Sequence, residues 1–164
     1  MNARDVARDF VATASSFADT FIQHISPDDS AVDWSELQRR RRRVCAAVWA
    51  AIVATFEASA LTDQEKARVL PVVRQEMLAA WNKHCVADPA SQEEIMDRAR
   101  YFLRNHDRSS PLKTATRIMK HLLGSIDPKA VQTSTTKRLA ALLAHRMLTD
   151  LRRLNEFKST RSIE

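Results

Sequence analysis

Residues 39–56 read RRRRRVCAAVWAAIVATF, and this stretch decides the fold. Its last thirteen residues, Val44 to Phe56, carry no charged side chain and include five alanines. A basic cluster before an apolar run is typical of a membrane anchor. However, a spanning helix needs about 20 apolar residues, and Glu57 interrupts this run at its fourteenth position. We therefore expect a buried helix of a globular protein and no membrane association.

Helical geometry gives this stretch two apolar faces. At 100° per residue, large side chains share one broad face, namely Leu37, Val44, Val48, Ile52 and Phe56. Ala46, Ala50 and Ala54 form a second face, whose small side chains allow another helix to approach closely. A helix that is apolar on both faces belongs inside a bundle. The helix expected over 34–59 is therefore the buried central element.

Gly124 is the single glycine among 164 residues. Phosphate-binding loops, dinucleotide-binding turns and nucleophile elbows all use glycine where the backbone needs positive φ or close approach. Such sites are disfavoured here. A chain of this composition is expected to consist almost wholly of right-handed helix.

Prolines and capping residues divide the chain into about six helices. These are expected over 3–25, 34–59, 63–85, 92–105, 112–123, and from about 128 or 133 to 157. Pro71 should kink or divide the third helix, and Gly124 should end the fifth as a C-terminal cap. Capping-box patterns occur at Asp33/Glu36, Thr62/Glu65 and Ser91/Glu94. The predicted fold class is an all-α, single-domain helical bundle.

Charge is distributed unevenly along the chain. Residues 1–34 contain two arginines and six aspartates, whereas the whole chain carries a net charge of +6. The predicted domain covers 1–157, with an acidic N-terminal arm over 1–34 and basic helices over 111–157, and 158–164 form a flexible tail. The acidic arm could neutralise the basic helices of the same chain, in competition with an external anionic partner.

The arginine run 39–43 has two interpretations. Arg41 falls on the large apolar face, while Arg39, Arg40 and Arg43 point away from it. Because an unpaired buried arginine is very costly, Arg41 needs solvent or an acidic partner, for which Asp28, Asp29 and Asp33 are the candidates. The run is either a helix end that pairs internally, or a patch, Arg39, Arg40, Arg41, Arg42 and Arg43, that binds carboxylates or phosphates.

The last helix carries a second basic region. Leu139, Leu143, Met147, Leu151 and Leu154 form its apolar stripe, and opposite them lie Arg138, Arg146, Arg152 and Arg153 with His145. An ordinary solvated face mixes charges of both signs, whereas this one is nearly all basic. Lys113, Arg117 and Lys120 of the fifth helix extend it. Asp150 lies toward the apolar side, and we expect it to pair with an arginine rather than act as a catalytic acid.

Catalytic and cofactor signatures are weak. The five histidines form no His-x-x-x-His pair, and no Glu-x-x-His is present, so neither a metal site nor a cofactor is predicted. Ser134-x-x-Lys137 matches a penicillin-binding pattern, but its companion motifs are absent. Cys45 and Cys85 indicate a reducing compartment, and we expect a cytoplasmic protein that is not an enzyme.

These features favour a binding or regulatory module of the adaptor, inhibitor or effector type, which docks an acidic protein through its arginine-rich surface. The alternative is a nucleic-acid-associated protein that makes non-specific phosphate contacts. The connection between the last two helices is longer than a helix-turn-helix motif uses, so sequence-specific reading is disfavoured. An enzyme or cofactor carrier is a third, less favoured class. The amphipathic first helix is also compatible with a homodimer.

Overall fold

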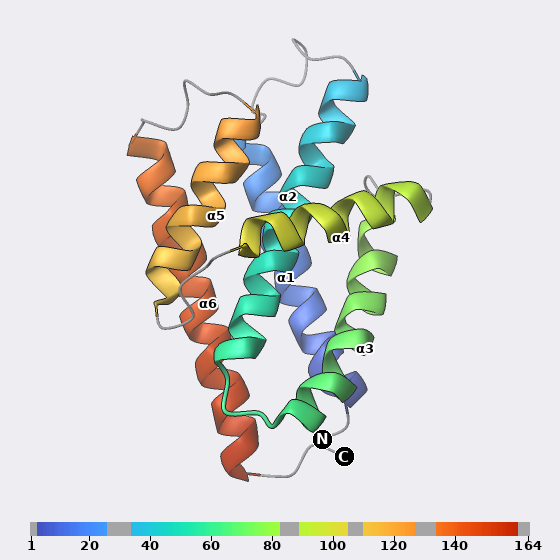
Figure 1. The fold of residues 1–164 in the computed structure, drawn as a ribbon, viewed down its shortest axis with the longest axis vertical. Helices are drawn as coiled ribbons and strands as arrows, with labels where there is room; N and C mark the ends of the chain where they lie inside the picture. The colour runs from blue at the N-terminus through green and yellow to red at the C-terminus, as the bar shows by residue number, and fades with distance from the viewer. Residues whose placement is uncertain (1–2, 26–33, 83–88, 105–109, 127–133, 161–164) are drawn as a thin grey trace.

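A computed structural model of the protein describes residues 3–25, 34–82, 89–104, 110–126 and 134–160. Over these ranges the chain forms six α-helices and no β-strand (Figure 1). The helices are α1 (Ala3–Ile25), α2 (Trp34–Ala58), α3 (Asp63–Trp81), α4 (Pro89–Leu103), α5 (Pro111–Ile126) and α6 (Ser134–Thr160). The predicted all-α helical bundle is confirmed.

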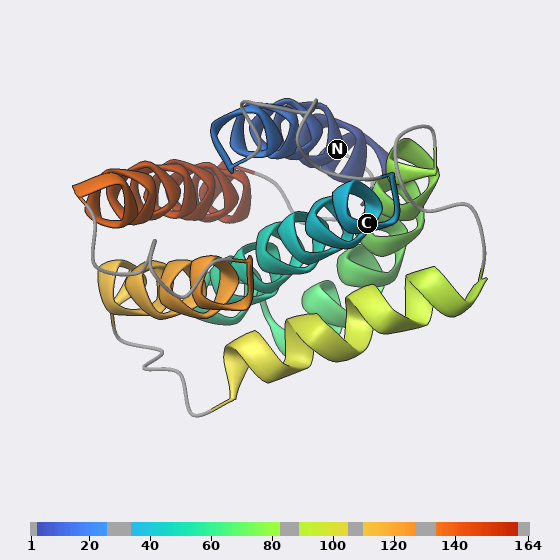
Figure 2. The ribbon, with the colours of Figure 1, turned by 90° about the horizontal axis from the view of Figure 1, so that it is seen from above.

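Helix α2 runs through the middle of the bundle. It contacts each of the other five helices. Seen from above, α1 lies on one side of α2 and α4 on the other, while α5 and α6 form a pair at one flank and α3 lies at the opposite flank (Figure 2). The helix expected to be central therefore occupies that position.

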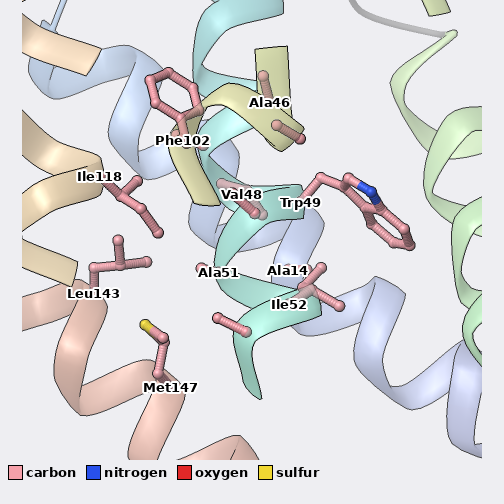
Figure 3. Packing of buried hydrophobic residues seen from close by; sticks show 14 of the residues in the cluster. Ala14, Ala46, Val48, Trp49, Ala51, Ile52, Phe102, Ile118, Leu143 and Met147 are labelled. Carbon is pink, nitrogen blue, oxygen red and sulfur yellow. The ribbon is translucent and has the colours of Figure 1, made fainter. Parts of the chain in front are cut away.

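The core surrounds the uncharged half of α2. Every residue from Val44 to Phe56 is buried except Val53, which is partly buried. The alanine face is closely packed, since Ala46 and Ala50 are 0% exposed, and Ala46 lies where α4 crosses α2 (Figure 3). Elsewhere the ring centroids of Phe10 and Phe56 lie 5.2 Å apart and join α1 to α2. Both faces also meet α6, because Ala54 lines one small cavity with Met147, and Val48 and Ile52 line another with the same residue.

Capping residues explain where several helices begin. The predicted capping box of α3 is confirmed: the amide of Glu65 donates to Thr62 Oγ1 (3.2 Å), and the amide of Thr62 donates to Glu65 Oε2 (2.7 Å). At α5, Ser110 Oγ accepts from the amide of Lys113. The predicted cap at Ser91 is wrong, because α4 begins two residues earlier with Pro89, whose missing N–H costs nothing in a first turn. Asp33, the remaining predicted cap, lies outside the described residues.

Several predicted helix ends differ from the structure. Helix α3 ends at Trp81, before the expected end at residue 85, and it is not divided at Pro71. The proline lies on the exposed side of α3, and buried Val69 and Val73 flank it within the helix. Gly124 is no C-terminal cap, because α5 continues through it to Ile126. Helix α6 extends to Thr160, beyond the expected end at residue 157.

We predict that Ala50→Leu destabilises the fold by about 1–3 kcal/mol, because three added carbons must enter a fully packed helix contact. Urea unfolding followed by circular dichroism measures the change. Ala79→Leu, at an exposed position inside α3, is the matched control and should change stability by less than about 0.5 kcal/mol. Equal effects of the two substitutions would contradict the close approach of a helix to Ala50.

We also predict that Gly124→Ala raises the free energy of unfolding by about 0.5–1 kcal/mol. Alanine reduces the entropy of the unfolded chain and has the higher helix propensity, and the half-buried Gly124 lies within the last turn of α5. The same urea experiment detects the gain. A loss of stability would show instead that this backbone position needs positive φ.

Candidate partner-binding surfaces

The five arginines of α2 do not form one patch. Consecutive residues of a helix are 100° apart, so Arg39–Arg43 point to all sides of α2. Each of them is partly buried rather than fully exposed. Their surroundings include other helices of the bundle and the first turns of α2 itself.

Glu36 organises the first two arginines. Arg39 donates from Nε and Nη2 to the two carboxylate oxygens of Glu36, at 2.7 and 2.6 Å. Arg40 Nε donates to the same carboxylate at 3.1 Å. Hydrogen bonding from Arg39 is the main cause that lowers the pKa of Glu36 from 4.5 to about 2. One carboxylate therefore holds two guanidinium groups along α2.

Arg39 also reaches the end of another helix. Its Nη1 donates to the backbone oxygen of Ser125 in α5 at 3.1 Å. The last carbonyls of a helix have no partner within the helix and carry a partial negative charge. A cation at this position supplies both a donor and a complementary charge, which accounts for the continuation of α5 beyond Gly124.

Two further arginines of α2 lie toward α4. Arg42 Nε is 3.2 Å from Glu94 Oε2, a contact between opposite charges. Arg43 lies in a more positive environment: burial and the charges of Arg98 and Arg39 lower its pKa. The Nε atoms of Arg42 and Arg43 are both buried without a hydrogen-bond partner, so the contact of Arg42 with Glu94 is an ion pair only. Internal pairing therefore accounts for Arg42 better than for Arg43.

Arg41 stacks on an aromatic ring. Its guanidinium carbon lies 5.9 Å from the ring centroid of Trp34, within the range of a cation–π interaction. Trp34 is 69% exposed. The predicted partners Asp28, Asp29 and Asp33 all lie outside the described residues.

The arginines of α6 divide into two groups. Arg146 Nε donates to Asp150 Oδ2 at 2.9 Å, and Arg153 Nη2 donates to Asp9 Oδ2 of α1. The expected pairing of Asp150 with an arginine is confirmed. Burial raises the pKa of Asp150, which shows that Arg146 does not fully offset the loss of water. These two arginines direct their charge toward the bundle.

Arg138 and Arg152 are instead exposed on the outer side of α6. Lys120 is exposed on α5, which runs antiparallel beside α6 (Figures 1 and 2). The sequence of α5 contains no carboxylate, and α6 contains only Asp150 and Glu156. We call this surface the α5–α6 face: Leu112, Lys113, Lys120, Lys137, Arg138, His145, Leu148 and Arg152, all of them exposed.

Two large apolar side chains lie among these cations. Leu112 is 56% exposed and Leu148 is 48% exposed. They lie at the same level of the helix pair, because Pro111 and Thr114 line one small cavity together with Met147 and Leu151. The α5–α6 face thus combines positive charge with exposed apolar surface.

Sequence patterns did not reveal every feature of these surfaces. Trp34, the large aromatic residue that begins α2, is mostly exposed. The pairing of Glu94 with Arg42 depends on how α4 crosses α2, for which no local signal exists. Leu112 and Leu148 could have been found, since both lie off the apolar stripes of their helices.

The first helix, the histidines and Cys85 were also considered in the sequence analysis, and the structure describes only some of these residues. Phe10 of the amphipathic helix α1 is 1% exposed and packs against Phe56 within the chain. His121 packs edge-on to Tyr101 with ring centroids 5.4 Å apart, and burial lowers its pKa. His84 and Cys85 lie outside the described residues.

Within the described ranges, no three histidine, cysteine, aspartate or glutamate side chains cluster closely enough to hold a metal ion. In the same ranges, none of the helices combines the length and apolar character needed to cross a membrane. Comparison of the chain with family models, with curated proteins and with solved structures found no match.

We predict that Glu36 stabilises the fold in a pH-dependent way. Its pKa is about 2 in the folded chain and 4.5 ordinarily, so the stabilisation is complete above pH 4.5 and is lost as the pH falls toward 2. Glu36→Gln should therefore lower the unfolding free energy at pH 6 and have a progressively smaller effect between pH 4.5 and 3.

Urea titrations at several pH values measure this difference, with Glu93→Gln, an exposed glutamate of α4, as the control. Because the Glu36 side chain is 31% exposed, 1 M salt should weaken the effect. A Glu36→Gln effect that is constant from pH 6 to pH 3 would contradict the linkage.

Proposed function

We propose that this protein is a non-enzymatic binding module that docks the acidic surface of a partner protein through the α5–α6 face. An adaptor, inhibitor or effector would use such a surface. The proposal rests above all on the one-sided charge of this face. Lys120, Arg138 and Arg152 are exposed there, and α5 carries no carboxylate. Of the two carboxylates of α6, Asp150 is buried against Arg146, which leaves Glu156 as the exposed one.

The exposed leucines favour a protein partner over a nucleic acid. Protein interfaces combine apolar anchors with arginine and exclude water around them. Phosphate binding requires cations but makes no use of Leu112 and Leu148. A partner that presents carboxylates around an apolar pocket would match both properties of the face.

The arginines of α2 have a smaller part in this proposal. Arg39, Arg40 and Arg42 already contact carboxylates of the same chain. A partner would have to replace those contacts rather than neutralise unoccupied charge. Arg41 with Trp34 is the part of this run best suited to extend an interface, because both residue types are frequent in interface hot spots.

We predict that the double variant Arg138→Glu/Arg152→Glu binds the partner at least tenfold more weakly. Reversing two charges replaces attraction with repulsion, and tenfold corresponds to about 1.4 kcal/mol. The matched control is Arg68→Glu/Arg74→Glu, which changes the same charge at exposed positions of α3 and should preserve binding.

The measurement begins with capture from nuclease-treated host lysate on immobilised wild-type, test and control proteins. The captured protein is then purified, and its Kd for each variant is measured at 50 and 300 mM salt. If both double variants lost the same affinity, the net charge of the protein would explain the loss, and the proposal of a specific binding face would be contradicted. Recovery of nucleic acid alone, with steep salt dependence, would favour the phosphate-binding alternative.

Leu148→Ala separates the two partner classes. We expect it to weaken binding to an acidic protein about threefold to tenfold, because an exposed leucine buried at an interface contributes about 1 kcal/mol. Binding to a nucleic acid should not change. Calorimetric titration with the purified partner, and with a single-stranded oligonucleotide as the comparison ligand, measures both.

A further inference from the structure

A small cavity lies where α1, α2 and α6 meet. Its apolar lining comes from Ala14 of α1, from Val48, Ala51 and Ile52 of α2, and from Leu143 and Met147 of α6. Figure 3 shows these six side chains around one space, with α6 on one side and α1 on the other. The space open to the centre of a water molecule is about 20 Å³.

The cavity also has polar walls. Arg146, Asp150 and Thr55 complete its lining. Asp150 is 6% exposed, and although its Oδ2 accepts from Arg146 Nε, its Oδ1 is buried with no hydrogen-bond partner. Arg146 Nη2 is likewise buried and unpartnered. A donor and an acceptor thus border the same cavity without bonding to each other.

Unpaired buried groups of this kind are expensive. A buried donor or acceptor without a partner costs about 1–3 kcal/mol, and charged groups cost more. Native proteins therefore satisfy nearly all of them, often with ordered water. A water site needs at least about 10–15 Å³ and two to four polar partners, and this cavity meets both conditions.

We propose that the cavity holds one ordered water molecule as a structural ligand. The water accepts a hydrogen bond from Arg146 Nη2 and donates to Asp150 Oδ1. Its second hydrogen bonds to Thr55 Oγ1, whose own hydroxyl donates to the backbone oxygen of Ala51 at 2.7 Å. The size of the cavity excludes larger ligands, and the Arg146 guanidinium disfavours a cation.

This water would link α6 to α2 at a fixed rotation. Asp150 and Arg146 lie on the inner side of α6, and Arg138 and Arg152 lie on its outer side. Polar contacts that must be satisfied on the inner side restrict rotation of α6 about its axis. The hydrated pair therefore adds to the buried stripe Leu139, Leu143, Met147 and Leu154 in fixing which residues of α6 face outward.

A crystal structure at about 1.8 Å resolution is the direct test. We expect a density peak at hydrogen-bond distance, roughly 2.7–3.2 Å, from Asp150 Oδ1 and Arg146 Nη2. A cavity without density, in which Nε and Nη2 of Arg146 contact the two carboxylate oxygens of Asp150, would overturn the proposal. Water-to-amide nuclear Overhauser effects at residues 51 and 150 test the same site in solution.

A stability cycle gives a second, independent readout. Ala51→Val fills the cavity, so it should displace the water and raise the equilibrium constant for unfolding about tenfold. In the variant Asp150→Leu/Arg146→Met, no charged side chain needs the water. There Ala51→Val should raise the equilibrium constant for unfolding by a factor at least fivefold smaller. An equal cost of Ala51→Val in both backgrounds, or a gain of stability in the wild-type background, would contradict a hydrated cavity.

Discussion

The burial of residues 44–56 of α2 on nearly all sides is the constraint on which the rest of the structure depends. A single helix cannot bury its whole circumference against one neighbour, so five other helices must surround it. The two faces of α2 then determine how they do so. The alanine face permits the crossing helix α4 to approach closely, while Phe56 meets Phe10 of α1.

The same constraint gives the arginine run an unfavourable desolvation free energy. Arg39–Arg43 directly precede Val44, so five cations enter the edge of the core in every direction around α2. No single acidic surface could neutralise them all. The chain distributes them instead: Glu36 takes two, Glu94 contacts one, and an aromatic ring covers another. Arg39 also uses its charge at the end of α5, where the helix dipole favours a cation. A run that resembles a binding patch in the sequence is therefore largely part of the framework.

Local patterns predicted the features that depend on local physics. The bounds of α1 and α2, the capping box of α3 and the burial of the apolar run follow from periodicity and capping within a few residues of each site. The wrong or missing predictions concern features that depend on residues far away in the sequence. Gly124 does not end α5, and Arg39, 86 positions before Ser125, donates to the Ser125 carbonyl in the last turn of the helix. The pairing of Arg42 with Glu94 likewise depends on the crossing of two helices, which no periodicity encodes. Asp150 was predictable because both it and Arg146 lie on one helix, four residues apart.

The candidate surface is what remains after internal pairing. On α6, Arg146 pairs with the buried Asp150, and Arg153 pairs with Asp9 of α1 at the surface, so neither carboxylate balances the outer arginines. Because α5 has no carboxylate of its own, the outer side of the helix pair carries mostly positive charge, with Glu156 as the exposed carboxylate of α6. Neutralising the interior and charging the exterior are thus consequences of the same arrangement. Any rotation of α6 that exposed Asp150 would weaken both, since it would leave Arg146 without its partner and add a negative charge beside Arg152. The inner polar contacts and the outer basic face therefore depend on one orientation of this helix.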